Sequence, residues 1–236
     1  MNTTDLDPVW ESAIYSQGNH LNLYPFDSVV SYVFRYRPKN KNRKDTKIIE
    51  VGCGAGNNLW FAAREGFMVT GIDGSKSAIS FAEKRFQEDE LKADLRVGSF
   101  LKLPWENNSF DMGIDRGSLV CVNYDNQKTA VEEMRRVLIP GGMFLSTSYS
   151  DKHTSAHSGT ILEDGRITNI KAGKLAGVGS LCFNSKEQLL ELFAKGWNII
   201  SLEEKITSDI VNTTTGNTEE IHAEWNIIAQ KRKNCL

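Results

Sequence analysis

A short apolar strand that runs directly into a glycine-rich turn constrains this chain more than any other feature. The segment 48–51 (IIEV) is followed by Gly52, Gly54 and Gly56, and then by a helical pattern through Ala63. A strand-to-helix turn of this kind needs glycines because its backbone adopts positive φ angles and comes close to a bound ligand. In open α/β sheets, ligands bind beyond the carboxyl ends of the strands. The segment therefore predicts a parallel α/β sheet with a ligand site at this turn.

The pattern that follows alternates strands with helices as far as residue 148. Strands are predicted over 68–72, 95–97, 110–114 and 143–148, and helices over 75–87, with Ser75 as N-cap, and over 126–138. Pro140-Gly141-Gly142 is expected to turn the chain into the fifth strand. This rhythm indicates a parallel sheet with helices on both faces. We predict a Rossmann-like, doubly wound α/β sheet of seven strands, mostly parallel, with an antiparallel last strand.

Two regions differ from this pattern. Residues 1–46 are expected to form an N-terminal helical cap, with helices over about 5–18 and 26–36, and a basic linker. Residues 47–236 would form the main domain, in which 150–184 is a polar insert without a sustained period. A helix over 185–195 and two β-like runs, 197–207 and 219–231, follow the insert. We expect the two runs to form an antiparallel hairpin joined by the polar segment 208–218.

Composition excludes several classes of protein. The 28 Lys and Arg residues nearly balance 30 Asp and Glu, for a net charge of −2, which disfavours an enzyme that holds nucleic acid by bulk charge. No apolar run approaches the ~18 residues of a membrane span, and segment 1–9 lacks the features of a secretory signal. Four cysteines form no CxxC pair and no zinc-ligand spacing, so we expect reduced thiols and no metal site: Cys53, Cys121, Cys182 and Cys235. We therefore expect a cytoplasmic enzyme, a monomer or a homodimer.

The residues around the glycine turn select among nucleotide ligands. Asp73 ends the second strand 19 residues after Gly54, where a carboxylate would reach the hydroxyls of a ribose. The dinucleotide fingerprint has a third glycine where this chain has Asn57, and the carboxylate of Glu50 would repel a pyrophosphate. A carboxylate there suits a ligand that carries an amino group and a sulfonium. A nicotinamide dehydrogenase is thus disfavoured.

Five segments between Lys47 and Ser148 together resemble class I S-adenosylmethionine-dependent methyltransferases: IIEVGCGAGNN, VTGIDGS, RVGSFLKLPW, NSFDMGIDRGSL and EEMRRVLIPGGMFLSTSY. The segment DRGSL is also similar to thiopurine-type small-molecule methyltransferases. The whole chain resembles bacterial methyltransferases of surface-glycan pathways. The resemblance implies S-adenosylmethionine as cofactor and S-adenosylhomocysteine as product.

The resemblance also assigns site residues. It implies that the glycines line the cofactor, that Asp73 binds the ribose and that Asp115 faces the methionine part. Ser99, where the family often has Asp, and Phe100 would flank the adenine. The predicted cofactor-binding residues are Tyr15, Glu50, Gly52, Cys53, Gly54, Gly56, Asn57, Asn58, Asp73, Gly74, Ser75, Ser99, Phe100, Asp115 and Arg116.

The substrate is expected where the cap, the insert and the hairpin connection 208–218 meet over the carboxyl edge of the sheet. Burial of Ile221, Ala223 and Trp225 would leave Glu220 and His222 on one shared face. A hydroxyl acceptor needs a base during methyl transfer, and histidine suits that role near pH 7. Solvent exposure is the alternative for His153 and His157. The predicted catalytic residues are His222, His153 and Asp115, and the predicted substrate contacts are Tyr149, Asp151, His157 and Glu220.

The predicted function is methyl transfer to a small polar acceptor, such as a sugar or a surface-glycan precursor. One alternative is an RNA or protein methyltransferase that uses the basic stretch 35–47 as its platform. That stretch would enter the sheet at the edge away from the cofactor, where a solvated linker is expected. The other alternative is a non-catalytic module that only binds S-adenosylmethionine. The N-terminal aromatics Trp10 and Tyr15 would either close over the cofactor or belong to the core.

Overall fold

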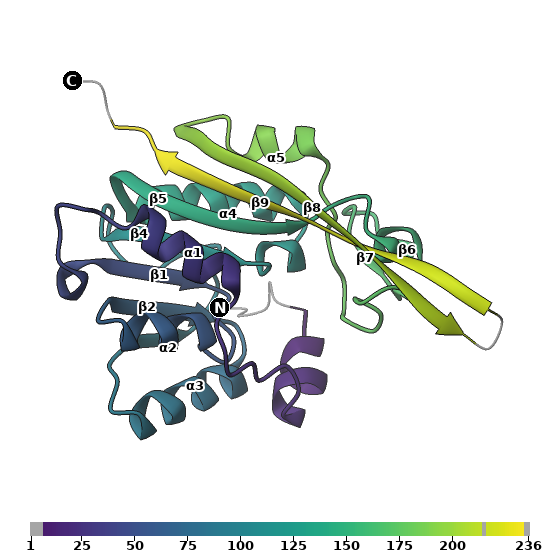
Figure 1. Cartoon of the computed structure of the whole chain (residues 1–236), viewed down its shortest axis with the longest axis horizontal. Coiled ribbons are helices and arrows are strands. Elements are labelled where there is room, and N and C mark those ends of the chain that lie inside the picture. The colour runs from purple at the N-terminus through teal and green to yellow at the C-terminus, as the bar shows by residue number, and fades with distance from the viewer. Residues whose placement is uncertain (1–6, 214–215, 234–236) are drawn as a thin grey trace.

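A seven-stranded sheet forms the centre of the computed structural model, which describes residues 7–213 and 216–233 (Figure 1). Its strand order is β3-β2-β1-β4-β5-β9-β8. The first five strands are parallel, β9 is antiparallel to β5, and β8 is antiparallel to β9. This confirms the predicted Rossmann-like sheet. The strands are β1 (Lys47–Val51), β2 (Met68–Asp73), β3 (Asp94–Val97), β4 (Phe110–Arg116), β5 (Leu138–Tyr149), β8 (Trp197–Thr213) and β9 (Gly216–Lys231).

Helices cover both faces of the sheet because successive strand residues point to opposite sides. Ile48 belongs to the core under α1 (Asp27–Tyr36), α2 (Asn57–Arg64) and α3 (Lys76–Glu88). Its neighbour Ile49 belongs to the core under α4 (Tyr124–Val137) and α5 (Lys186–Leu192). Ser75 caps α3 by accepting a hydrogen bond from the amide of Ala78, as predicted.

The N-terminal segment is less regular than the helix predicted over residues 5–18. A π-turn, Trp10–Ile14, passes into a 3-10 turn, Tyr15–Gln17, which ends at Gly18 in the left-handed region. Asp5 and Leu6 lie outside the described residues. The carboxylate of Glu11 accepts hydrogen bonds from the hydroxyl groups of Ser75 and Ser77 at the start of α3. These bonds fasten the segment beside the glycine turn.

Two predicted connections are strands instead. Residues 140–142 do not turn into the fifth strand: β5 already begins at Leu138, and the chain bulges between the pairs Phe110–Leu138 and Met112–Met143. The segment 208–218 was predicted as a polar connection, but β8 continues to Thr213 and β9 starts at Gly216. Cross-strand backbone pairing extends along these polar residues because the ladder needs main-chain groups only. The hairpin therefore projects beyond the end of the main sheet (Figure 1).

The insert between residues 150 and 184 packs beside the end of β4. It contains the 3-10 turn Thr154–His157 and a small sheet of β6 (Thr160–Ile161) and β7 (Ile167–Thr168), which its irregular sequence did not predict. Its apolar side chains form a third core with Val120 and Cys121. The hydroxyl of Thr154 accepts a hydrogen bond from the amide of Ile221 at 2.7 Å. The insert and the projecting hairpin are thereby joined.

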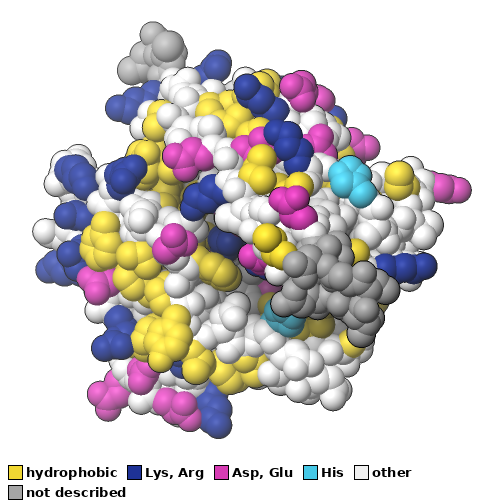
Figure 2. Space-filling view, turned by 45° about the vertical axis from the view of Figure 1, so that its right-hand side comes forward, with side chains coloured by type: hydrophobic (Ala, Val, Ile, Leu, Met, Phe, Trp, Pro, Cys, Tyr) yellow, Lys and Arg dark blue, Asp and Glu magenta, His cyan; other side chains and the backbone are white. Residues whose placement is uncertain are grey.

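The surface carries both signs of charge. Figure 2 shows Lys and Arg side chains interspersed with Asp and Glu on one face. In the basic stretch 35–47, Lys41 pairs with Asp111 at 2.7 Å and Arg43 with Glu65 at 2.8 Å. Within residues 7–213 and 216–233, no helix has the length and apolar character that crossing a membrane requires.

Candidate active site

A cavity of about 360 Å³ opens where the parallel strands end, a volume within the roughly 300–1,000 Å³ of small-ligand sites. It is lined by residues from β1, β2, β4, β5 and β9 and from the N-terminal segment. The structure brings these predicted residues to its wall: Tyr15, Glu50, Gly52, Cys53, Gly54, Asn57, Asn58, Asp73, Gly74, Phe100, Arg116, Tyr149 and His222.

Glycine is required at two positions of the turn after β1. Gly52 and Gly54 have φ angles of 61° and 50°. A Cβ atom on Gly52 would lie 2.1 Å from the Cβ of Ser118, and one on Gly54 would lie 2.7 Å from the hydroxyl of Tyr15. The turn is therefore closed in between the loop after β4 and the N-terminal segment.

The carboxylate of Asp73 fixes the same turn. Its Oδ2 accepts a hydrogen bond from the amide of Gly54 and its Oδ1 one from the amide of Ser75, both at 2.8 Å. Burial raises the pKa of Asp73, although both amides favour the ionised form. The position at the end of β2, on the cavity wall, is the one expected for a group that binds ribose hydroxyls.

Glu50 is a buried carboxylate on the cavity wall with one uncompensated oxygen. Its side chain is 2% exposed; Oε1 accepts a hydrogen bond from Asn58 at 2.7 Å, and Oε2 has no partner among the described residues. Burial raises the pKa of Glu50 to about 8. A cationic ligand would supply the missing partner and favour the ionised form. The free carboxylate oxygen of Glu50 thus fits the amino and sulfonium groups of S-adenosylmethionine.

Asn57 and Asn58 connect the start of α2 to the N-terminal segment. Asn57 donates to the carbonyl of Tyr24 at 2.8 Å, and Asn58 accepts from the amide of Phe26 at 3.0 Å. The ring of Phe26 lines the cavity, with the guanidinium of Arg116 at 4.3 Å from its centroid. Asn58 therefore holds Phe26 at the cavity wall, and Asn57, which replaces the third glycine, holds the nearby Tyr24.

Asp115 does not have the predicted place opposite the methionine part. It is fully buried, and Oδ1 accepts from the hydroxyl and the amide of Ser118 and from the amide of Leu119. Its Oδ2 accepts from the hydroxyl of Ser146 at 2.7 Å. Burial raises the pKa of Asp115, and the hydrogen bonds oppose that rise. The carboxylate holds the loop after β4, and the neighbouring Gly117 and Ser118 line the cavity instead.

Other predicted residues lie outside the lining that the structure describes. Gly56 packs against Ala82 of α3, and Ser75 is occupied as helix cap and partner of Glu11. Ser99 accepts a hydrogen bond from the amide of Leu101. Among the predicted substrate contacts, Glu220 accepts a bond from the amide of Gly173, while two side chains are exposed: Asp151 and His157.

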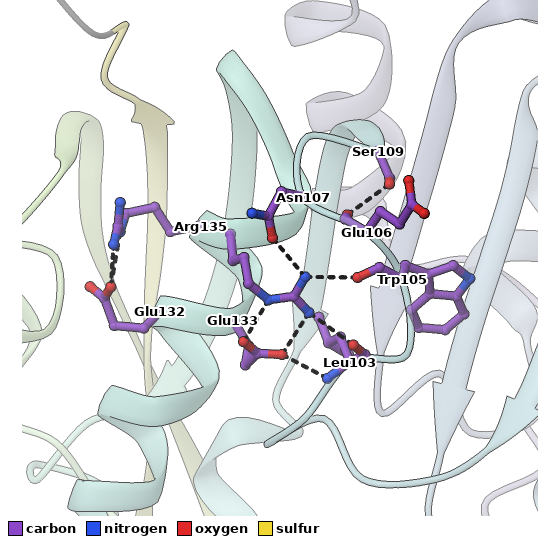
Figure 3. A network of polar contacts seen from close by, with 9 residues as sticks. Leu103, Trp105, Glu106, Asn107, Ser109, Glu132, Glu133 and Arg135 are labelled. Atoms are coloured by element: carbon purple, nitrogen blue, oxygen red, sulfur yellow. Dashed lines mark hydrogen bonds and ion pairs between the residues drawn. The ribbon is translucent and has the colours of Figure 1, made fainter.

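The loop that carries Phe100 to the cavity is clamped by α4 (Figure 3). The guanidinium of Arg136 donates to the carbonyls of Leu103 and Trp105 at 2.8 and 2.7 Å. Glu133 pairs with Arg136 and accepts from the amide of Leu103 at 2.8 Å. The connection between β3 and β4 is thereby held at a fixed distance from the sheet.

At the ends of β5 and β9 the structure joins the two predicted catalytic histidines. His153 is fully buried, and its Nε2 lies 2.9 Å from Nδ1 of His222. The Nε2 of His222 lies 3.7 Å from Glu224, whose Oε2 also accepts from Arg116 at 3.1 Å. Burial and the neighbouring His222 lower the pKa of His153 to about 4. The ring of Tyr149 packs edge-on against both histidines.

Sequence reasoning missed part of this wall. Glu224 is not among the predicted site residues, but it is 8% exposed and lines the cavity. The signal was present, because a carboxylate two residues from His222 points to the same face of the strand. Trp10, for which closure over the cofactor was one of two expectations, also lines the cavity. The other unpredicted lining residues are His20, Asn22, Phe26, Ala55, Gly117, Ser118 and Cys121. Ala55 lies within the glycine turn, and Gly117, Ser118 and Cys121 follow β4, where strand ends meet.

Comparisons with known proteins agree with this geometry. Residues 48–142 match a family described as a methyltransferase domain. The chain is 28% identical over 176 residues to EEF1A lysine methyltransferase 2 of Danio rerio, covering 71% of this chain and 61% of that protein. It is 29% identical over 204 residues to sarcosine/dimethylglycine N-methyltransferase of Aphanothece halophytica, covering 85% of this chain and 69% of that protein. The chain thus spans less than two thirds of the length of the Danio rerio relative.

A solved S-adenosylmethionine-dependent methyltransferase of Methanosarcina mazei has the same fold, with a TM-score of 0.66 at 22% identity. The alignment covers 89% of this chain and 99% of that one. Three observations point to the same family: the strand order, the glycine turn with Asp73 at the end of β2, and the match over residues 48–142. The family match over residues 48–142 and the shared fold support a class I S-adenosylmethionine-dependent methyltransferase.

Proposed function

We propose that this chain transfers a methyl group from S-adenosylmethionine to a small polar acceptor, such as a sugar or a surface-glycan precursor. The observation that carries the proposal is the continuity of the cavity. It joins Glu50 and Asp73 at the glycine turn to Tyr149, His222 and Glu224 at the ends of β5 and β9. An in-line transfer needs a cofactor end and an acceptor end in one cavity. Here the cofactor end would lie at the glycine turn and the acceptor end at the ends of β5 and β9.

The residues at the glycine turn account for cofactor binding. Asp73 would hold the ribose hydroxyls and Glu50 the amino group, while Phe100 would pack beside the adenine. When bound, S-adenosylmethionine supplies an electrophilic methyl group on a sulfonium. The N-terminal segment contributes Trp10 and Tyr15 to the cavity wall, so it would exclude water from the transfer.

The enclosure of the acceptor end favours a small molecule. The insert and the hairpin meet beside His222, which leaves a pocket and not an open platform. The basic stretch is no better suited to nucleic acid, because Lys41 and Arg43 pair with acidic side chains. The Aphanothece halophytica relative is named for small polar substrates, and we extend that class to this chain. A cytoplasmic location is part of the proposal, since three free cysteines are buried without pairing: Cys53, Cys121 and Cys182.

Calorimetric titration with S-adenosylmethionine, S-adenosylhomocysteine and NAD tests the proposal. We expect both sulfur nucleosides to bind the wild-type chain and to lose binding in Asp73→Ala. Methyl uptake into small-molecule fractions should then follow. Binding of NAD alone, or of none of the three, would reject the cofactor. Tight binding without methyl uptake into any fraction would favour a non-catalytic module.

A further inference from the structure

The amide of Ser155 sets the proton positions of two histidines. It donates to Nδ1 of His153 at 3.0 Å, so this nitrogen must be the unprotonated one. A neutral imidazole carries one proton, which therefore sits on Nε2 of His153. That proton points at Nδ1 of His222, 2.9 Å away, so Nδ1 of His222 accepts. The single proton of neutral His222 is then on Nε2.

His222 therefore directs its Nε2–H group toward the cavity and Glu224. To act as a base toward the cavity, His222 would need an unprotonated Nε2 and therefore a protonated Nδ1. Two protons would then lie between His222 and His153 if Nε2 of His153 kept its proton. If that proton moved to Nδ1 of His153, the hydrogen bond from the Ser155 amide would be lost. His222 is therefore not arranged as a base, in contrast to the role predicted from the sequence. His20, another histidine on the lining, is exposed and packs against Trp10.

The groups around Glu224 all stabilise its ionised form. Arg116 donates to Oε2 at 3.1 Å, Asn226 donates to Oε1 at 3.4 Å, and Nε2 of His222 approaches Oε2 at 3.7 Å. Burial would raise the pKa of Glu224, but His222 and Arg116 outweigh it and lower the pKa to about 2. The acceptor end thus presents a fixed carboxylate to whatever enters it.

We propose that the methyl acceptor is an amine nitrogen, held by the carboxylate of Glu224, and not a hydroxyl oxygen. This inference rests on the proposed function and narrows its acceptor to amine-bearing molecules, amino sugars included. The reacting form is the neutral amine, whose nitrogen carries a lone pair. An ammonium form would first lose its proton to water, so no protein base is required. The lone pair forms the new C–N bond while the C–S bond breaks and its electron pair passes to sulfur. The resulting ammonium releases a proton to water, and Glu224 balances its charge until then.

Selective blocking of amines separates this inference from the proposed function. A small-molecule extract of the cells that make the protein would be assayed for methyl uptake from S-adenosylmethionine. The assay is repeated after acetic anhydride has acylated amines and hydroxylamine has removed esters. We expect uptake in the untreated extract and its loss after acylation. Uptake that survives acylation overturns the inference alone. No uptake in either extract, with cofactor binding intact, overturns the proposed function.

Glu224→Gln and Glu203→Gln form a matched pair, because Glu203 is exposed on the neighbouring β8. We expect methyl uptake to fall about 10- to 100-fold in Glu224→Gln, because a charge-assisted hydrogen bond to the amine is lost. S-adenosylhomocysteine should still bind this variant. Equal uptake in the two variants contradicts the role of Glu224. The wild-type chain provides a second measurement, the ¹⁵N spectrum of its histidines with S-adenosylhomocysteine bound. We expect Nε2 protonated in both His153 and His222; a protonated Nδ1 in His222 overturns the proton assignment.

Discussion

His153 and His222 form a hydrogen-bonded pair, Nε2 to Nδ1 at 2.9 Å, although 69 residues separate them along the chain. The insert brings His153, and the last strand brings His222. The bond between Thr154 and the amide of Ile221 keeps the two elements together. The acceptor end of the cavity is therefore built by two segments that have no local relationship in sequence.

Substitution of His222 distinguishes a hydrogen-bond donor from a base. We expect His222→Phe to lower methyl uptake about tenfold or more, because the N–H group 3.7 Å from Glu224 is removed. His222→Gln should retain more uptake than His222→Phe, since its amide can still donate. Cofactor affinity, measured by calorimetry, should remain in both. Equal and complete loss of uptake in the two variants would indicate a base.

Cofactor binding should depend on the ionisation of Glu50. Its pKa of about 8 means that much of this carboxylate is protonated at neutral pH in the ligand-free protein. A cationic ligand favours the ionised form, so affinity for S-adenosylmethionine should rise with pH up to about 8, with proton release on binding. Calorimetry in buffers of different ionisation enthalpy measures that release. Glu50→Gln should weaken binding and remove the pH dependence; the same slope in the variant would contradict this role.

Glu50 should also affect the stability of the ligand-free chain. The folded state holds this proton more tightly than the unfolded state, whose pKa is near 4.5. Between these values the folded state binds more protons, so the free energy of unfolding should fall as pH rises from about 5 to 8. Urea unfolding at the two pH values measures the difference. In Glu50→Gln the fall should be smaller; an unchanged fall would assign it to other groups.

Asp115 should be required for stability. Asp115→Ala removes the acceptor of Ser118, Leu119 and Ser146 inside the core, and we expect a loss of about 3–5 kcal/mol in the free energy of unfolding. The matched control is Asp125→Ala, whose side chain is 90% exposed and which should cost at most about 1 kcal/mol. Denaturant unfolding measures both. Similar values for the two variants would contradict the buried network.

Glu11 should control how fast the cofactor leaves. Its bonds to Ser75 and Ser77 lower its pKa and fasten the N-terminal segment beside the cavity. In Glu11→Ala we expect faster release of S-adenosylhomocysteine, measured by stopped-flow displacement. In the wild type the same acceleration should appear only well below pH 4.5, because the lowered pKa of Glu11 delays its protonation. A release rate equal to that of the wild type would mean that the segment is held by other contacts.

Local sequence patterns were enough to predict the sheet and the glycine turn at its edge. Strand and helix periods are local, and one face of each element has to be buried, so the order of elements could be read from the pattern. Gly52, Gly54 and Asp73 were predictable for the same reason: they follow strands whose carboxyl ends meet at one edge. The polar segment 208–218 was misjudged, because strand pairing requires only main-chain groups.

The roles of the remaining polar residues depend on contacts between segments that are remote in sequence. Asp115 lies near the end of β4 as Asp73 lies at the end of β2. The carboxylate of Asp115 accepts hydrogen bonds from the loop after β4, whereas Asp73 lies on the cavity wall. His153 became the partner of His222 because the insert folds back onto β9. A hydrogen bond depends on distances of about 3 Å between atoms that are remote in sequence. Periodicity fixes which face a residue occupies, but it does not fix what lies opposite that face.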